Sequence, residues 1–114
     1  MEGRVFDFTE VKENLVEMEG ASSAYIRWLL GPSDGVPNFY LRMFRLEKGG
    51  HTPYHLHPYE HEVFVIRGKG TVKIGNKDFS LKGGSVAFVP PNEMHQFMAD
   101  GGEELVFLCI IPKT

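Results

Sequence analysis

Short runs of β-branched and aromatic residues, each closed by a turn, recur along most of the chain and constrain its fold more than any other feature. Thirteen glycines and seven prolines supply turns such as "GPSDG", "RGKG", "IGNKD" and "DGGE". Short strands at this regular spacing are typical of antiparallel sandwiches and barrels. The predicted strands occupy residues 24–30, 38–47, 62–66, 71–74, 78–81, 85–89, 94–98 and 104–111. The sequence therefore predicts an all-β fold.

The N-terminal region follows this pattern less clearly. "TEVKENLVEM" (9–18) places Val11, Leu15 and Met18 at helical spacing, which favours a short helix, although Val and Asn weaken that prediction. "RVFDF" (4–8) has β-forming residues but no obvious hairpin partner nearby. Since an unpaired strand attracts another chain, residues 1–22 are expected to contribute to a homodimer contact.

Length, charge and cysteine content limit the possible classes of protein. A chain of 114 residues has room for one domain, and residues 1–114 are assigned to it. The net charge of −3 and the scattered Lys and Arg argue against a nucleic-acid partner. Neither a membrane span nor the apolar core of a signal peptide is visible, so no membrane partner is expected. The single cysteine excludes an internal disulfide and suits a reducing cytoplasm, which is the expected location.

Four of the five histidines lie within eleven residues, in "HTPYHLHPYEH" (51–61). His55 and His57 are one residue apart, so in an extended segment both imidazoles point to the same face and can bind one metal ion. His61 follows the turn-like "PYE", and His95 stands alone in a later predicted strand. Such crowding is difficult to explain by packing, because unpaired buried imidazoles are costly. A metal site is therefore predicted, whereas His51 is interpreted as a surface or hydrogen-bonded residue without a direct role.

The spacing around these histidines resembles the two sequence motifs of the cupin family. In the first motif a glycine, five residues and H-x-H are followed by a further ligand, six residues and a second glycine, and residues 49–68 match this pattern. Residues 84–99 match the second motif, in which a glycine, five residues and a proline precede a histidine. The resemblance implies a single cupin domain with a double-stranded β-helix, or jelly-roll, barrel.

Three positions depart from the common cupin pattern. The fourth ligand of most cupins is a glutamate, and this chain has His61 there. Glu62 competes for the role, but it is five residues from Gly68 rather than six, and in a strand it would face away from His61. His61 is therefore assigned as the ligand. Asn92 replaces a motif glycine, and Ala99 replaces the final asparagine.

The complete set of candidate metal ligands is His55, His57, His61 and His95. This set resembles the small prokaryotic manganese cupins with four histidines, which also contain "EHE" (60–62) and "FLC-x-IP", here "FLCIIP" (107–112). The resemblance implies one divalent transition metal, with manganese first and iron, copper, nickel or zinc as alternatives. Four neutral ligands leave the charge of the ion uncompensated, which favours anionic ligands. Glu60 and Glu62 either orient an imidazole or are solvated surface carboxylates.

Four further residues are candidates for the pocket around the metal. Phe97 shares a strand face with His95. The resemblance implies that Phe107 and Cys109 also face the metal, although a small buried hydrophobe explains Cys109 as well. Arg42 lies mid-strand among apolar neighbours, where it is either exposed or an inward anchor for an anionic substrate. The resemblance favours the inward orientation.

The expected function is that of a metal-dependent oxygenase or related redox enzyme acting on a small organic molecule. Two alternatives remain open, namely a non-catalytic module that binds a small ligand, and a non-redox isomerase or lyase that uses the metal as a Lewis acid. The fold cannot decide between them, because one fold hosts many chemistries.

Overall fold

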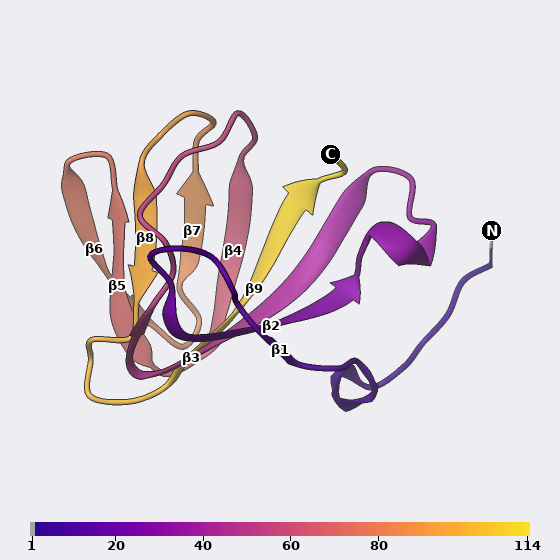
Figure 1. Ribbon diagram of the computed structural model, residues 1–114, viewed down its shortest axis with the longest axis horizontal. Helices are drawn as coiled ribbons and strands as arrows, with labels where there is room; N and C mark the ends of the chain where they lie inside the picture. The colour runs from indigo at the N-terminus through magenta and orange to yellow at the C-terminus, as the bar shows by residue number, and fades with distance from the viewer. Residues whose placement is uncertain (1) are drawn as a thin grey trace.

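The computed structural model describes residues 2–114, which form nine β-strands and two short 3₁₀ helices and contain no α-helix (Figure 1). The elements are η1 (Phe8–Glu10), β1 (Asn14–Leu15), β2 (Ser22–Leu30), η2 (Pro32–Asp34), β3 (Phe39–His51), β4 (His61–Arg67), β5 (Lys69–Ile74), β6 (Lys77–Lys82), β7 (Val86–Val89), β8 (His95–Met98) and β9 (Leu105–Pro112). Strands β2 to β9 correspond to the eight predicted runs. The all-β prediction is thereby confirmed.

The helical alternative for residues 9–18 is wrong. A single 3₁₀ turn, η1, ends at Glu10 and is capped by the Asp7 side chain, and β1 then pairs antiparallel with β2. Tertiary pairing outweighs a weak helical pattern here, because β2 offers backbone partners to a segment that already contains β-branched residues. Residues 4–7 are exposed and extended, and within residues 2–114 they belong to no strand.

One strand, β3, belongs to both halves of the curled sheet, in which the strands follow the order β6-β5-β8-β3-β9-β4-β7. Its first part pairs with β9, and its end pairs with β8 through His51 and Met98. The strand turns between these partners at Gly49 and Gly50. A Cβ atom on Gly50 would lie 2.7 Å from the carbonyl oxygen of Ser23, so this close approach requires glycine.

The core follows the alternation of inward and outward side chains along each strand. In β4 the residues His61, Val63 and Val65 are buried, while Glu62 and Phe64 are exposed. Strands β2 to β9 each contribute residues to one cluster, whose largest fully buried members are Phe107, Leu46, Leu105, Val65, Val72, Val89 and Cys109. The same alternation directs the side chains of β3, β8 and β9 into the barrel, where the candidate site lies.

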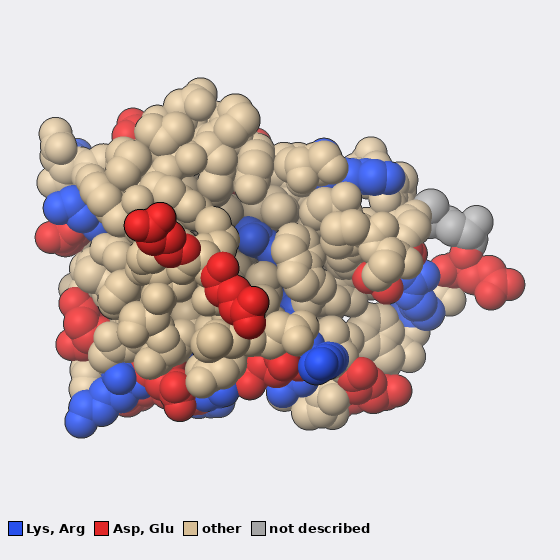
Figure 2. Space-filling model, viewed as in Figure 1, with Lys and Arg blue, Asp and Glu red and all other residues tan. Residues whose placement is uncertain are grey.

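The charged residues are mixed in sign on the face shown in Figure 2, where they gather mainly along the lower edge while the upper part is largely uncharged. No extended patch of Lys and Arg is visible on this face. Within residues 2–114, none of the helical segments has the length and apolar character needed to cross a bilayer.

Candidate metal centre

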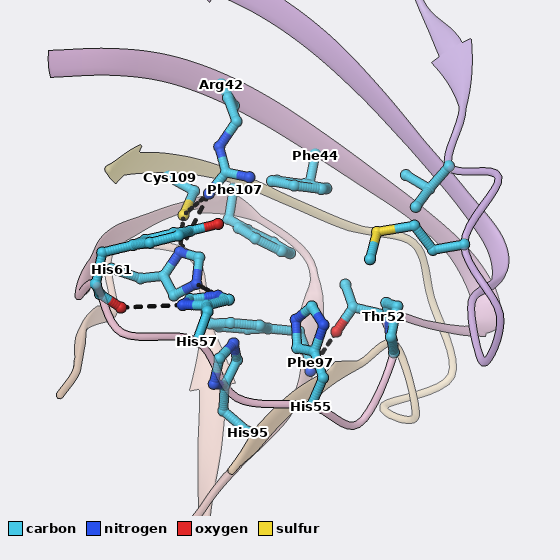
Figure 3. A pocket seen from close by; sticks show the side chains of 14 residues that line it. Arg42, Phe44, Thr52, His55, His57, His61, His95, Phe97, Phe107 and Cys109 are labelled. Atoms are coloured by element: carbon cyan, nitrogen blue, oxygen red, sulfur yellow. Dashed lines mark hydrogen bonds between the residues drawn. The ribbon is translucent and has the colours of Figure 1, made fainter. Parts of the chain in front are cut away.

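A cavity of about 120 Å³ opens into the barrel and contains the predicted site (Figure 3). Strands β3, β4, β8 and β9 form its inner walls, and the segment between β3 and β4 forms one side of its mouth. The lining residues are Val16, Met18, Arg42, Phe44, Thr52, Pro53, His55, His57, Tyr59, His61, His95, Phe97, Phe107 and Cys109. All four candidate ligands and all four pocket candidates therefore line the same cavity.

Three imidazoles, those of His55, His57 and His95, form a group that could hold a metal ion. One nitrogen from each lies within 4.8 Å of the others. Two nitrogens that each lie ~2.1 Å from one ion are at most ~4.2 Å apart, so binding requires no more than a small inward shift of the rings. The donor set, uncharged imidazole nitrogen, suits first-row transition metals.

Backbone pairing brings these three histidines together. His55 forms an isolated antiparallel bridge with His95, in which each backbone N–H donates to the carbonyl oxygen of the other residue. Leu56 is exposed while His55 and His57 are half-buried, so the H-x-H alternation holds even though the segment is not part of a longer strand. Asn92, in the left-handed region with φ of 64°, donates its N–H to the carbonyl oxygen of His57 at 2.8 Å.

Backbone carbonyl groups fix the orientation of two of the rings. Nδ1 of His57 lies 3.0 Å from the carbonyl oxygen of Tyr59, and Nδ1 of His95 lies 2.9 Å from that of Glu93. Because a carbonyl only accepts, both Nδ1 atoms carry the proton and both Nε2 atoms keep a free lone pair. This is the tautomer that a metal-binding imidazole needs.

His61, the first residue of β4, lies beside the three-histidine group but has both ring nitrogens in contact with protein groups. Its Nε2 is 2.6 Å from Nε2 of His57, and its Nδ1 is 3.1 Å from Nη2 of Arg42 and 3.0 Å from Sγ of Cys109. As Nε2 of His57 carries a lone pair, His61 donates from Nε2 and accepts from Arg42 at Nδ1. To bind a metal through Nε2, His61 would have to carry its proton at Nδ1, where Cys109 Sγ can accept it.

Burial is the main electrostatic effect on the histidines. It lowers the pKa of His55, His57 and His95 from their usual values, and the nearby positive charge of Arg42 lowers each further. The same two causes, with the larger burial of His61, lower the pKa of that residue to about 2. Neutral imidazoles are the form in which histidine binds metals, so burial prepares all four rings for that role.

Arg42 lies inside the barrel with only 8% of its surface exposed. Nη2 donates to Cys109 Sγ at 3.0 Å, while Nε has no hydrogen-bond partner in the described part of the chain. The guanidinium also lies over Phe44 and Trp28, with distances of 5.0 and 5.5 Å to the ring centroids. Such cation–π contacts are each worth ~0.5–2 kcal/mol, which is less than the several kcal/mol that desolvating an ion costs.

Aromatic rings form the apolar walls of the cavity. Phe107 stacks on Phe44 and on Phe97, with centroid distances of 5.3 and 4.7 Å. Tyr59 stacks on the ring of His57 at 3.9 Å with an angle of 10° between the planes. The stacking of Tyr59 restricts rotation of the His57 ring, and the phenylalanine rings give the cavity an apolar surface beside the histidines.

Three residues weighed in the sequence lie outside the cavity. Glu62 is exposed on the outer face of β4, on the side opposite to the buried His61. Glu60 is half-buried but does not line the cavity. The groups that bond Nδ1 of His57 and of His95 are the backbone carbonyls of Tyr59 and Glu93. His51 is half-buried near Gln96 and Thr52, away from the other histidines.

Six further residues line the cavity without having been predicted from the sequence, namely Phe44, Tyr59, Thr52, Pro53, Val16 and Met18. Phe44 was recognisable, because it shares the inward face of β3 with Arg42. The alternation of Val16 and Met18, two residues apart, was a strand-like signal, but the helical spacing of Val11, Leu15 and Met18 obscured it. The stacking of Tyr59 on His57 depends on the path of a loop and had no signal in the sequence.

The family match and a similar solved structure both indicate a cupin domain. The family described as "Cupin domain" matches residues 42–111. The polyketide cyclase RemF from Streptomyces resistomycificus has 31% sequence identity and a TM-score of 0.90, covering 100% of this chain and 81% of that chain. A cupin-2 domain protein of Rhodospirillum rubrum has 24% identity and a TM-score of 0.85, covering 97% of this chain and 75% of its own, and supports the fold alone.

A curated relative is the 1-methylthio-D-xylulose 5-phosphate methylsulfurylase of Rhodospirillum rubrum, with 31% identity over 71 residues. The match covers 62% of this chain and 46% of that protein, so the chain spans about half the length of the curated relative. These comparisons confirm the predicted cupin barrel.

Proposed function

The chain belongs to the cupin domain family, and from that premise we propose that it is a metal-dependent enzyme that acts on a small organic molecule. One observation carries the proposal: three histidine nitrogens lie within 4.8 Å of one another at an apolar cavity of about 120 Å³. An enzyme of this type requires a group of metal-binding side chains next to a space for a small molecule.

We propose His55, His57, His61 and His95 as the metal ligands, with manganese as the first candidate metal. The closeness of His61 Nε2 to His57 Nε2 and the exposure of Glu62 support His61 over its neighbour. When bound, the ion supplies Lewis acidity or redox chemistry to a substrate in the cavity.

The remaining cavity residues would have distinct tasks. The carbonyl groups of Tyr59 and Glu93 hold protons on Nδ1 of two ligands, so that the opposite nitrogens stay free. Phe97 and Phe107 pack against the apolar part of the substrate and exclude water. Cys109 Sγ lies where it can accept the Nδ1 proton of His61.

For the reaction we propose first an oxygenase or related redox conversion. An ion with four protein ligands has two positions left when it is six-coordinate, enough for a substrate and a small co-ligand. Imidazole nitrogens suit iron and copper, which change oxidation state, and manganese, the metal that the resemblance implies, does so as well.

A non-redox, Lewis-acid ring closure is the second candidate. It is favoured by the 31% identity to the polyketide cyclase RemF across the whole of this chain. In that case the metal would polarise a carbonyl group of the substrate and no oxidant would be consumed.

Metal analysis and oxygen uptake test these proposals together. The untagged protein should contain about one divalent metal per chain by elemental analysis, and His57→Ala should lose most of it while His51→Ala keeps it. Less than a tenth of that amount after reconstitution would contradict the metal enzyme. Oxygen consumption that depends on an added organic substrate supports the redox reaction, whereas full turnover under anaerobic conditions supports the ring closure.

We also propose a homodimer. Val5, fully exposed, belongs to an extended N-terminal segment that pairs with no strand of its own chain within residues 2–114. The outer face of β7, β4 and β9 is apolar as well, with Val86, Phe64 and Ile110 on neighbouring strands. A second copy of the chain would cover such surfaces.

A further inference from the structure

Arg42 differs from the four other arginines of the chain in having no carboxylate partner. Arg4, Arg27, Arg45 and Arg67 each lie within 4.0 Å of an Asp or Glu oxygen. Arg42 forms no ion pair with any of residues 2–114, although it is the most buried of the five. A buried charge needs a counter-charge more than an exposed one does, and among residues 2–114 the most buried arginine, Arg42, has none.

None of the groups around Arg42 supplies a negative charge. The 14 residues that line the cavity include neither Asp nor Glu. The side chains within hydrogen-bond distance of Nη2 of Arg42 are Cys109, through Sγ, and His61, through Nδ1, and neither is a carboxylate. The positive charge thus remains uncompensated, and Nε has no hydrogen-bond partner among the described residues.

We propose that this cavity binds a small organic monoanion, a carboxylate or enolate, with its oxygen atoms directed to Arg42 and its apolar body against Phe44, Phe97 and Phe107. The inference names the substrate class of the proposed enzyme and in that sense rests on the proposed function. Among the 14 described residues that line the cavity, Arg42 is the one Lys or Arg, so one negative charge balances it, whereas a phosphate dianion would require more donors. A divalent ion on neutral imidazoles would add to the preference for an anion.

Pairs of acids and their neutral amides of nearly the same shape test the anion preference. Propionate with propionamide and benzoate with benzamide are titrated calorimetrically into metal-free protein at about pH 8, where the imidazoles are neutral. In at least one pair we expect the acid to bind about 10- to 100-fold more tightly than the amide, the range for hydrogen bonds to charged groups. The Arg42→Gln variant should remove this preference, and Arg42→Lys should retain part of it.

The Arg45→Gln variant is the matched control. Arg45 is in the same strand but on the outer face, where it pairs with Glu13 and Glu104. Acid binding by this variant should equal that of the original protein. Thermal unfolding of ligand-free Arg42→Gln adds a readout that does not depend on a ligand, because removal of an uncompensated buried charge should leave the unfolding temperature unchanged or raise it.

Equal binding of acid and amide in both pairs, or no saturable binding of either acid, would overturn the anion site. A preference that persists in Arg42→Gln would overturn the role of Arg42. These results are separable from failure of the metal proposal: protein that never takes up metal but binds the acid through Arg42 would retain the anion site and lose the metal enzyme. Protein that binds one metal but prefers the amide would retain the metal enzyme and lose the anion site.

Discussion

His61 is the proposed ligand at which metal binding would compete with internal hydrogen bonding. Without metal it donates from Nε2 to His57 and accepts at Nδ1 from Arg42, and metal binding would reverse the position of its proton. The ligand would therefore gain the metal and lose a favourable contact with Arg42. This competition makes His61 the most informative histidine to replace.

Substitution of His61 should separate it from its neighbour Glu62. We expect His61→Ala to weaken metal retention by ~10–100-fold, the scale for disturbed metal environments, whereas Glu62→Gln, on the exposed outer face, should change it less than about twofold. Competition with a chromogenic chelator measures both affinities. The opposite ranking would show that the fourth ligand is the carboxylate, as in most cupins.

The buried histidines should make the metal-free protein sensitive to acid. Burial lowers the pKa of His61 to about 2 and lowers that of the other three below the usual value of about 6.5. Below pH ~6.5 the unfolded chain therefore binds more protons than the folded chain, so the free energy of unfolding falls as the pH falls. Urea titrations of chelator-treated protein at several pH values should show this slope.

The control for the acid dependence is His61→Gln, which keeps a polar side chain without an imidazole. Its free energy of unfolding should change less between pH 7 and pH 5 than that of the original protein. An identical slope in the two proteins would assign the acid sensitivity to other groups.

At the scale of elements, the two cupin motifs depend on glycines for different reasons. Gly68, after β4, has a φ of 98°, and a Cβ atom there would lie 1.9 Å from the carbonyl oxygen of Glu104. Gly84, before β7, has a φ of 92° but open space around its Cα. Both positions need the left-handed region, and only Gly68 also needs the absence of a side chain.

This contrast predicts a large difference between two identical substitutions. Gly84→Ala should lower the free energy of unfolding by ~1–2 kcal/mol, the cost of a left-handed alanine. Gly68→Ala should lower it by at least ~3 kcal/mol, because the β4–β5 connection must also move away from Glu104. Chemical denaturation of both variants measures the two costs, and equal losses would mean that the backbone relaxes freely around Gly68.

Asn92 replaces a motif glycine at a position with φ of 64°. Asparagine tolerates this region better than other residues with a Cβ atom, so the turn that supports His57 is kept. The departure from the cupin pattern is therefore conservative in backbone geometry.

At the scale of the whole molecule, the outer face of β7, β4 and β9 is an exposed apolar surface. Phe64 is 48% exposed in the centre of this face, between Val86 and Leu108 on the neighbouring strands. Apolar residues gathered on adjacent strands in this way commonly mark an association surface. The homodimer proposal rests on this face and on the N-terminal segment.

Light scattering after size-exclusion chromatography should give about twice the chain mass of 12.9 kDa. Phe64→Lys should shift the protein toward the monomer, because a charge would be buried in the interface. Leu56→Lys is the control: Leu56 is similarly exposed, at 49%, but lies in the loop beside the cavity. A monomer mass for the original protein at micromolar concentration would exclude the dimer.

The sequence by itself determined the eight strands, the all-β class and the grouping of histidines. These features follow from local patterns, since alternation with a period of two fixes which side chains share a face. His55 and His57 needed only their spacing, and His95 could be placed by the second cupin motif. Their role as ligands, and that of His61, stay predictions.

Only the tertiary structure decided the N-terminal path, the stacking of Tyr59 on His57 and the lack of an ion pair between Arg42 and any carboxylate of residues 2–114. Arg42 contacts His61, 19 residues away, and Cys109, 67 residues away. The alternation of side chains along a strand does not show which groups meet across strands, or which types of residue are absent from a cavity. The charge environment of the site is set by these distant contacts, because burial and counter-charge depend on everything packed around a group rather than on its neighbours in sequence.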